Sequence, residues 1–254
     1  MSITEWPLIL AFGVLAFCMN QSLYTVAVSR LPVGIALLLE YLAPVMIVLW
    51  VRLVRRSALP PAIWLGCAAV LVGMALVGEV WETFRLDILG VIAGVGTAIA
   101  LAARFLLTER GLLTRDPIAL SALGAMVGAT TLSILAPPTE FPWKQAIHAS
   151  AEFAGAQVPL WLLIAWLAVV STVIAYFCGV SAQRYLSSST MSQLATLEVL
   201  FAAGLASLIL GERLTIVQVS GGLIMLGGII CAQFMIARYK QQGRSSKPLV
   251  SEET

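Results

Sequence analysis

Two carboxylates stand inside long apolar stretches of the sequence. Glu40 lies in "LLLEYLAPVM" (37–46) with no basic residue within a helical turn, and Glu198 lies in "ATLEVLFAAG" (195–204). Placing a charged carboxylate in the middle of a bilayer costs about 2.5–3.5 kcal/mol on insertion scales. Loss of water also disfavours the charged form, so such a group can take up a proton on one side and release it on the other. We therefore expect Glu40 and Glu198 to couple proton movement or to contact a substrate such as a cationic amine.

Two other interpretations of these acids stay open. Each acid forms a structural hydrogen bond between helices and is permanently protonated, or the apolar stretch is displaced along the membrane normal so that the acid reaches water. The equivalent setting of Glu40 and Glu198 indicates a shared structural place and does not choose among these interpretations.

Further polar candidates surround the acids in the sequence. Pro44 lacks an N–H, so the carbonyl of Glu40 loses its helical partner, which predicts either a kink at a binding site or a tolerated membrane proline. Asn20, Gln21 and Tyr176 either line a wet cavity or hold helices together by hydrogen bonds. Arg104 lies about four residues before the expected end of its span, where it either extends to the headgroups or binds a substrate carboxylate. The candidate substrate and proton-coupling residues are Glu40, Glu198, Pro44, Asn20, Gln21, Tyr176 and Arg104.

No pattern typical of an enzyme or of a cofactor site occurs. The sequence has no H-E-x-x-H, no G-x-S-x-G and no Walker loop, so we expect transport, if any, to use ion or substrate gradients rather than ATP. The four cysteines are scattered one per apolar stretch, without metal or redox spacing. We predict no cofactor and no nucleic-acid partner, because the basic residues follow one face of a membrane.

Composition identifies the class of protein. Of the 254 residues, 60% are hydrophobic and only 11% are charged, against about 25% charged in a soluble domain. Continuous apolar stretches of about 20 residues suit helices that cross roughly 30 Å of hydrocarbon. The sequence therefore predicts an all-α polytopic membrane protein, with spans at 7–28, 33–53, 62–81, 88–108, 117–136, 159–182, 189–210 and 216–237.

Basic residues predict the orientation of these eight spans. With a cytoplasmic N-terminus, the four basic residues outside are Arg30, Arg85, Lys144 and Arg213, and the eleven inside are Arg52, Arg55, Arg56, Arg104, Arg110, Arg115, Arg184, Arg238, Lys240, Arg244 and Lys247. This excess favours both termini in the cytoplasm. We expect the connection 137–158 to lie at the membrane interface and the polar chain from Arg238 to be disordered.

An internal repeat relates the two acids. When Glu40 is aligned with Glu198, the next span of each half carries two glycines seven residues apart, Gly66 with Gly73 and Gly221 with Gly228. The span of Glu40 runs outside to inside and that of Glu198 runs inside to outside, so the two halves are inverted. Inverted repeats are common in secondary transporters, whose substrate sites lie near the bilayer midplane between the repeats.

Two stretches of the sequence resemble a known family of membrane proteins. "SRLPVGIALLLEYLAPV" and "SQLATLEVLFAAGLASLILGERLT" resemble EamA-type proteins of the drug/metabolite transporter superfamily, the first stretch most closely their threonine/homoserine exporters. The resemblance implies ten helices in two inverted five-helix repeats, with both termini cytoplasmic. It also implies export of small metabolites such as amino acids or amines across a bacterial inner (plasma) membrane.

The sequence departs from that pattern in its first half. Only three spans precede residue 85, so the family's first two helices, which help to line its cavity, are expected to be missing. The predicted division is an incomplete first repeat (1–84), a second repeat (85–240) and a cytoplasmic tail (241–254). In the second repeat, Ala202 stands where Pro44 stands in the first. An alternative function follows: a truncated or accessory membrane subunit without independent transport, in a homodimer or with partner helices that replace the missing pair.

Overall fold

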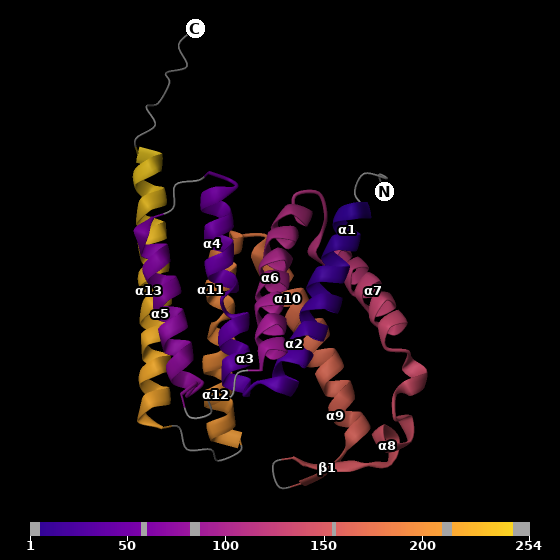
Figure 1. Cartoon of the computed structure of the whole chain (residues 1–254). Helices are drawn as coiled ribbons and strands as arrows, with labels where there is room; N and C mark the ends of the chain where they lie inside the picture. The colour runs from indigo at the N-terminus through magenta and orange to yellow at the C-terminus, as the bar shows by residue number, and fades with distance from the viewer. Residues whose placement is uncertain (1–5, 57–59, 82–86, 154–155, 210–214, 246–254) are drawn as a thin grey trace.

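Helices that run up and down in turn make up almost all of the fold (Figure 1). The computed structural model describes residues 6–56, 60–81, 87–153, 156–209 and 215–245. The first half contains α1 (Trp6–Phe12), η2 (Gly13–Met19), α2 (Asn20–Arg30), α3 (Val33–Glu40), α4 (Ala43–Leu53) and α5 (Pro61–Val77). The second half contains α6 (Ile88–Gly111), α7 (Pro117–Leu135), η3 (Pro138–Glu140), α8 (Trp143–His148), β1 (Ser150–Phe153), β2 (Ala156–Pro159), α9 (Leu160–Trp166), η4 (Leu167–Ile174), α10 (Ala175–Gln183), α11 (Ser188–Ala195), α12 (Leu197–Ile209) and α13 (Ile216–Ser245).

The predicted all-α polytopic class is confirmed. Within the described residues, six helical segments are long and apolar enough to cross a membrane: 6–30, 33–53, 88–111, 117–135, 160–183 and 216–235. Two further expected spans are present in shorter form. α5 is an apolar helix of 17 residues, and the span expected at 189–210 is divided into α11 and α12. α1 begins and α13 ends at the same end of the bundle (Figure 1).

Both spans that carry the candidate acids are broken beside the acid. α3 ends at Glu40 and α4 begins at Ala43, where Pro44 occupies the first turn, so the kink expected from Pro44 is present. α11 ends at Ala195 and α12 begins at Leu197, although no proline is nearby. At this second break the Thr196 hydroxyl donates to the Gln193 carbonyl at 2.6 Å, a side-chain bond of the kind that bends helices.

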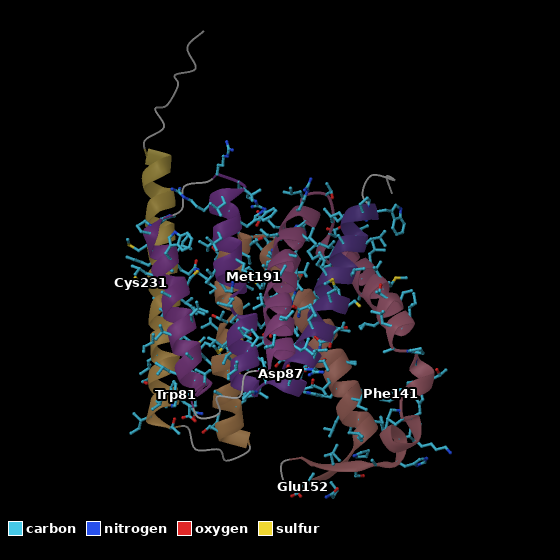
Figure 2. All side chains as sticks on the ribbon, viewed as in Figure 1. Trp81, Asp87, Phe141, Glu152, Met191 and Cys231 are labelled. Atoms are coloured by element: carbon cyan, nitrogen blue, oxygen red, sulfur yellow. The ribbon has the colours of Figure 1, made fainter. Side chains whose placement is uncertain are left out.

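Other features of the structure were not expected from the sequence. Two segments, η2 and η4, have π-helical hydrogen bonding, which widens the helix and frees carbonyl groups. The connection expected at the membrane interface contains a β-hairpin, in which Ser150 pairs with Pro159 and Phe153 with Ala156. Figure 2 places Phe141 and Glu152 of this connection at the end of the bundle opposite the start of α1.

The disorder expected from Arg238 onward is wrong as far as Ser245, because α13 continues to that residue. Arginine, lysine and glutamine are good helix formers, which explains why the helix extends past the apolar segment. Positions 246–254, and the basic residues Arg85, Arg213 and Lys247, lie outside the described residues.

The two glycine pairs singled out in the sequence meet each other across antiparallel helices α5 and α13. A Cβ added at Gly66 would lie 3.3 Å from the carbonyl oxygen of Gly228, and one added at Gly221 would lie 2.7 Å from that of Gly73. The helix backbones can approach this closely because neither partner carries a side chain there. This antiparallel, symmetric contact is the arrangement that an inverted repeat predicts.

We predict that Gly221→Ala destabilises the protein by about 1–3 kcal/mol, because the new methyl group overpacks against the Gly73 carbonyl and the Leu76 side chain. Gly227→Ala on the same helix is the matched control, since a Cβ there meets nothing within 4 Å. The measurement is the unfolding free energy of both variants in detergent micelles. Equal stabilities for the two variants would contradict the close α5–α13 contact.

Candidate functional site

A cavity of about 1060 Å³ lies between the helices of the two halves. All seven residues proposed from the sequence line it, although they come from six different helices. Its polar and charged lining consists of Asn20, Gln21, Tyr24, Glu40, Tyr41, Arg104, Ser171, Thr172, Tyr176, Ser192 and Glu198. The structure therefore brings the proposed residues together, while their roles remain predictions.

Helical spacing explains how each segment presents its residues to the cavity. In the first segment, Phe17, Asn20, Gln21 and Tyr24 line it at positions i, i+3, i+4 and i+7. The same spacing recurs across the α3–α4 break, with lining residues Leu37, Glu40, Tyr41 and Pro44. Residues at these intervals share one face of a helix, so the cavity wall follows from the sequence once the helices are packed.

Glu40 is partly buried and has a polar neighbour. The side-chain amide of Asn20 lies close enough to its carboxyl group to interact with it. Asn20 itself is only 7% exposed, and its Oδ1 atom has no partner among the described residues. A buried amide oxygen without a donor costs free energy, so this atom is an unfilled acceptor in the cavity wall beside a carboxyl group.

Glu198 has a different setting. It lies in the first turn of α12 and is exposed to the cavity, where among the described residues it forms no hydrogen bond or ion pair. The positive end of a helix dipole stabilises a negative charge in the first turn. Tyr24 and Tyr41 lie within electrostatic range of both acids, so the two carboxyl groups share one polar region.

Arg104 stacks on an aromatic ring inside the bundle. Its guanidinium carbon lies 4.1 Å from the centroid of the Tyr176 ring, which in turn stacks on Phe17 at 4.5 Å. The Tyr176 hydroxyl donates to the Ala16 carbonyl at 3.1 Å and thereby fixes the ring between η2 and α10. A cation over a tyrosine face gains about 0.5–2 kcal/mol, more where water is excluded.

The surroundings of Arg104 differ from those expected of a headgroup-seeking residue. α6 continues to Gly111, so Arg104 lies seven residues before the helix end rather than about four. Among the residues that the structure describes, no carboxylate forms an ion pair with it. The guanidinium therefore presents its N–H donors to the cavity.

The cavity thus has two chemical poles. The acids Glu40 and Glu198 supply acceptors for a positively charged group. Arg104 supplies donors for a carboxylate or another anion. Among the described side chains, no three His, Cys, Asp or Glu residues are arranged to hold a metal ion.

Sequence reasoning missed some of the residues that line the cavity. Tyr41 follows Glu40 directly, yet aromatic residues in an apolar stretch give no signal of a polar site. Gln193 is fully buried away from the cavity, where its Oε1 accepts from Gln233 at 3.0 Å and its Nε2 contacts the Ile63 carbonyl at 3.5 Å. It joins α11 to the α5–α13 pair, which is the helix-linking use of a membrane amide.

Comparison with known proteins supports the same class of molecule. Residues 1–78 and 88–233 match the EamA-like transporter family. A solved structure titled "Crystal structure of protein" superposes with a TM-score of 0.72 at 16% identity, over 92% of this chain and 79% of that chain. At that identity the likeness shows the fold alone. No curated protein matches the sequence.

The family match covers most of the chain and agrees with the helical fold and the polar cavity within it. The chain therefore belongs to the EamA-like transporter family of the drug/metabolite transporter superfamily and is a membrane transporter.

Proposed function

We propose that the protein exports small metabolites by alternating access coupled to proton uptake. We propose that it prefers amino acids to simple amines. The observation that carries this proposal is the single cavity in which all seven proposed residues meet. The site lies beside the breaks in α3–α4 and α11–α12, as in transporters whose discontinuous helices border the substrate site.

The two poles of the cavity support a zwitterionic substrate. A primary ammonium group has three donors, and the carboxylates of Glu40 and Glu198 offer acceptors for them. A substrate carboxylate would pair with Arg104, whose planar donor fork matches it. A simple amine would leave Arg104 without an anion, so the arrangement favours amino acids over amines.

Competition for the two acids supports the proposed coupling. A protonated carboxyl group holds an ammonium ion weakly, whereas an ionised one holds it strongly. Protons that arrive from the outer side would then displace the substrate, and release of the protons to the cytoplasm would allow the next substrate to bind. The direction of export follows from this exchange and from an inward proton gradient.

The distribution of charge supports a cytoplasmic location for both termini in a plasma membrane. Arg52 and Arg184 stand at helix ends that lie on the same side of the bundle as the start of α1, whereas Arg30 and Lys144 stand on the opposite side. Positively charged flanks favour the cytoplasmic side of a span.

We expect Glu40→Gln and Glu198→Gln each to reduce pH-driven substrate flux to near background in proteoliposomes, because an amide cannot exchange a proton. Glu152→Gln is the control, since Glu152 is an exposed carboxylate in the β-hairpin far from the cavity. The experiment compares flux with and without an imposed proton gradient. Unchanged flux in both cavity variants would reject coupling through the carboxyl groups.

Arg104→Gln is expected to weaken amino-acid binding by about 10- to 100-fold, the loss of one charge-assisted pair. Binding of the corresponding decarboxylated amine should change much less. Arg104→Lys should recover only part of the affinity because lysine lacks the donor fork. Titration of both ligands against the purified protein checks this, with exposed Arg52→Gln as the control. Equal losses for both ligands would count against carboxylate recognition.

A second candidate is an accessory subunit whose cavity is completed by a homodimer or by partner helices. It is favoured by one observation: none of the residues in α9 and η4 is buried, although Leu167, Ser171 and Thr172 of η4 form part of the cavity wall. The purified chain reconstituted alone distinguishes the candidates. We expect it to transport, whereas flux only after a second membrane protein is added would favour the accessory role.

A further inference from the structure

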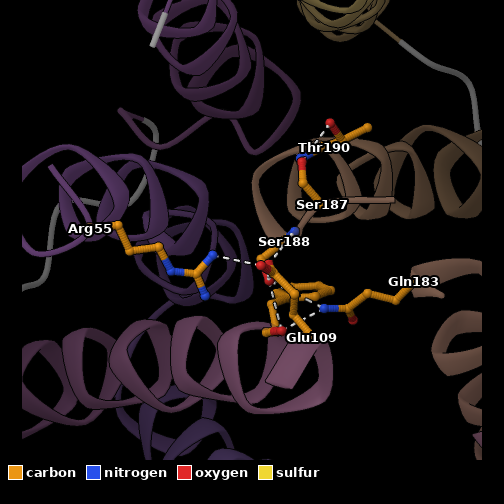
Figure 3. A network of polar contacts seen from close by, with 7 residues as sticks. Arg55, Glu109, Gln183, Ser187, Ser188 and Thr190 are labelled. Carbon is orange, nitrogen blue, oxygen red and sulfur yellow. Dashed lines mark hydrogen bonds and ion pairs between the residues drawn. The ribbon is translucent and has the colours of Figure 1, made fainter. Parts of the chain in front are cut away.

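A polar network joins α6, α10 and α11 with the chain after α4, at the end of the bundle where α1 begins and α13 ends (Figure 3). Glu109, near the end of α6, is paired with Arg55 at 2.6 Å between Oε1 and Nη1. Its other oxygen accepts the backbone N–H of Ser188 at 2.9 Å, and the Ser188 hydroxyl also contacts it. The Ser188 hydroxyl and the Gln183 amide both reach the carbonyl of Phe105. The network thus connects the chain after α4, the end of α6 and the start of α11.

An apolar plug lies directly beneath this network. It is formed by Ala43, Ile47 and Val51 of α4 and by Leu101, Ala102 and Phe105 of α6, with Met191 of α11 packed against them. Phe105 and Met191 also line the cavity. The plug therefore separates the cavity from this end of the bundle, and the network joins the three helices that enclose the plug.

The opposite end of the bundle is held differently. The described polar contacts there link Arg30 with Asp87 at 3.5 Å and Glu79 with Thr215 at 2.6 Å. These pairs join α2 to α6 and α5 to α13, and neither one reaches α11 or α12. Phe201, a lining residue of α12, is 71% exposed. Of these ion pairs and hydrogen bonds at the two ends, those that hold α11 belong to the Glu109 network.

Glu109 is suited to hold this closure reversibly. It caps the N-terminus of α11, where a carboxylate gains from both the free N–H and the helix dipole. The side chains of Arg55 and Glu109 are 39% and 28% exposed, and exposed ion pairs add little to global stability. The pair can therefore separate without unfolding the protein. Because α11 leads through Ser192 to Glu198, its displacement would change the cavity.

We propose that Glu109 is a latch that keeps the cavity closed at the end bearing the termini, and that the cavity opens there only when Glu109 releases Ser188 and α11. This inference rests on the alternating access of the proposed function and adds the residue that controls one side of it.

The test uses Met191→Cys as a reporter in a full-length chain whose four native cysteines are replaced by alanine. A membrane-impermeant maleimide is applied to vesicles from each side in turn. Glu109→Gln should raise the labelling rate from the network side about tenfold, the effect of weakening a charge-assisted hydrogen bond, and lower the rate from the opposite side. Ser188→Ala should act in the same direction, because it removes the hydroxyl contacts but retains the Arg55–Glu109 pair.

Asp116→Asn provides the matched control. It breaks another ion pair at the same end, Arg184–Asp116 at 3.4 Å, which joins the end of α10 to the residue before α7. Unchanged labelling in both latch variants, or an equal rise in Asp116→Asn, would overturn the proposal. Labelling needs neither substrate nor a proton gradient. If the unaltered protein shows no proton-driven flux but the latch variants show the expected labelling shift, the proposed transport chemistry fails and the latch stands.

Discussion

The cost of keeping charged groups away from water governs the interior of this protein. Two carboxyl groups and one guanidinium face a common cavity, and each would be expensive against hydrocarbon. Asn20 supports Glu40, the first turn of α12 supports Glu198, and the ring of Tyr176 supports Arg104. No ion pair among the described residues joins the acids to Arg104, so their charges remain available to a substrate rather than neutralising each other.

This arrangement requires helices that are broken where the acids stand. An unbroken helix satisfies its own backbone and presents only side chains, whereas a break adds free backbone groups and a local dipole end. The two halves reach this result by different means. Pro44 removes a donor after Glu40, while the Thr196 hydroxyl bonds back to the Gln193 carbonyl before Glu198. The two acids therefore differ chemically although their positions in the repeat are equivalent, since Glu40 ends a helix and Glu198 lies at the beginning of one.

Rigid and separable contacts occupy different parts of the bundle. The α5–α13 pair is held by glycine backbones in close approach and by the buried Gln193–Gln233 bond, contacts that tolerate little movement. The contacts around Glu109 are polar, partly exposed and concentrated at one end. The proposed alternating access needs both a fixed frame and a closure that can open, and this division of contacts is suited to it.

The sequence by itself determined the membrane class, the order of the helices and seven of the residues that line the cavity. Apolar length sets where a helix crosses a bilayer, and an acid or arginine in such a stretch is rare enough to indicate function. The glycine pairs also indicated a close helix contact, because small residues are needed wherever backbones meet. The repeat boundaries and the orientation in the membrane stay predictions.

Tertiary structure alone decided which of these residues meet and what each one contacts. The sequence does not show that Arg104 lies over the ring of Tyr176, which the packing of its helix decides, and its role stays a prediction. The span expected at 88–108 stops before Glu109, because the sequence does not show that α6 continues to Gly111 or that α11 begins beside it. The physical reason is that hydrophobicity along the chain reports burial from water, whereas contacts between helices depend on rotation and register, which apolar residues specify only through packing in three dimensions.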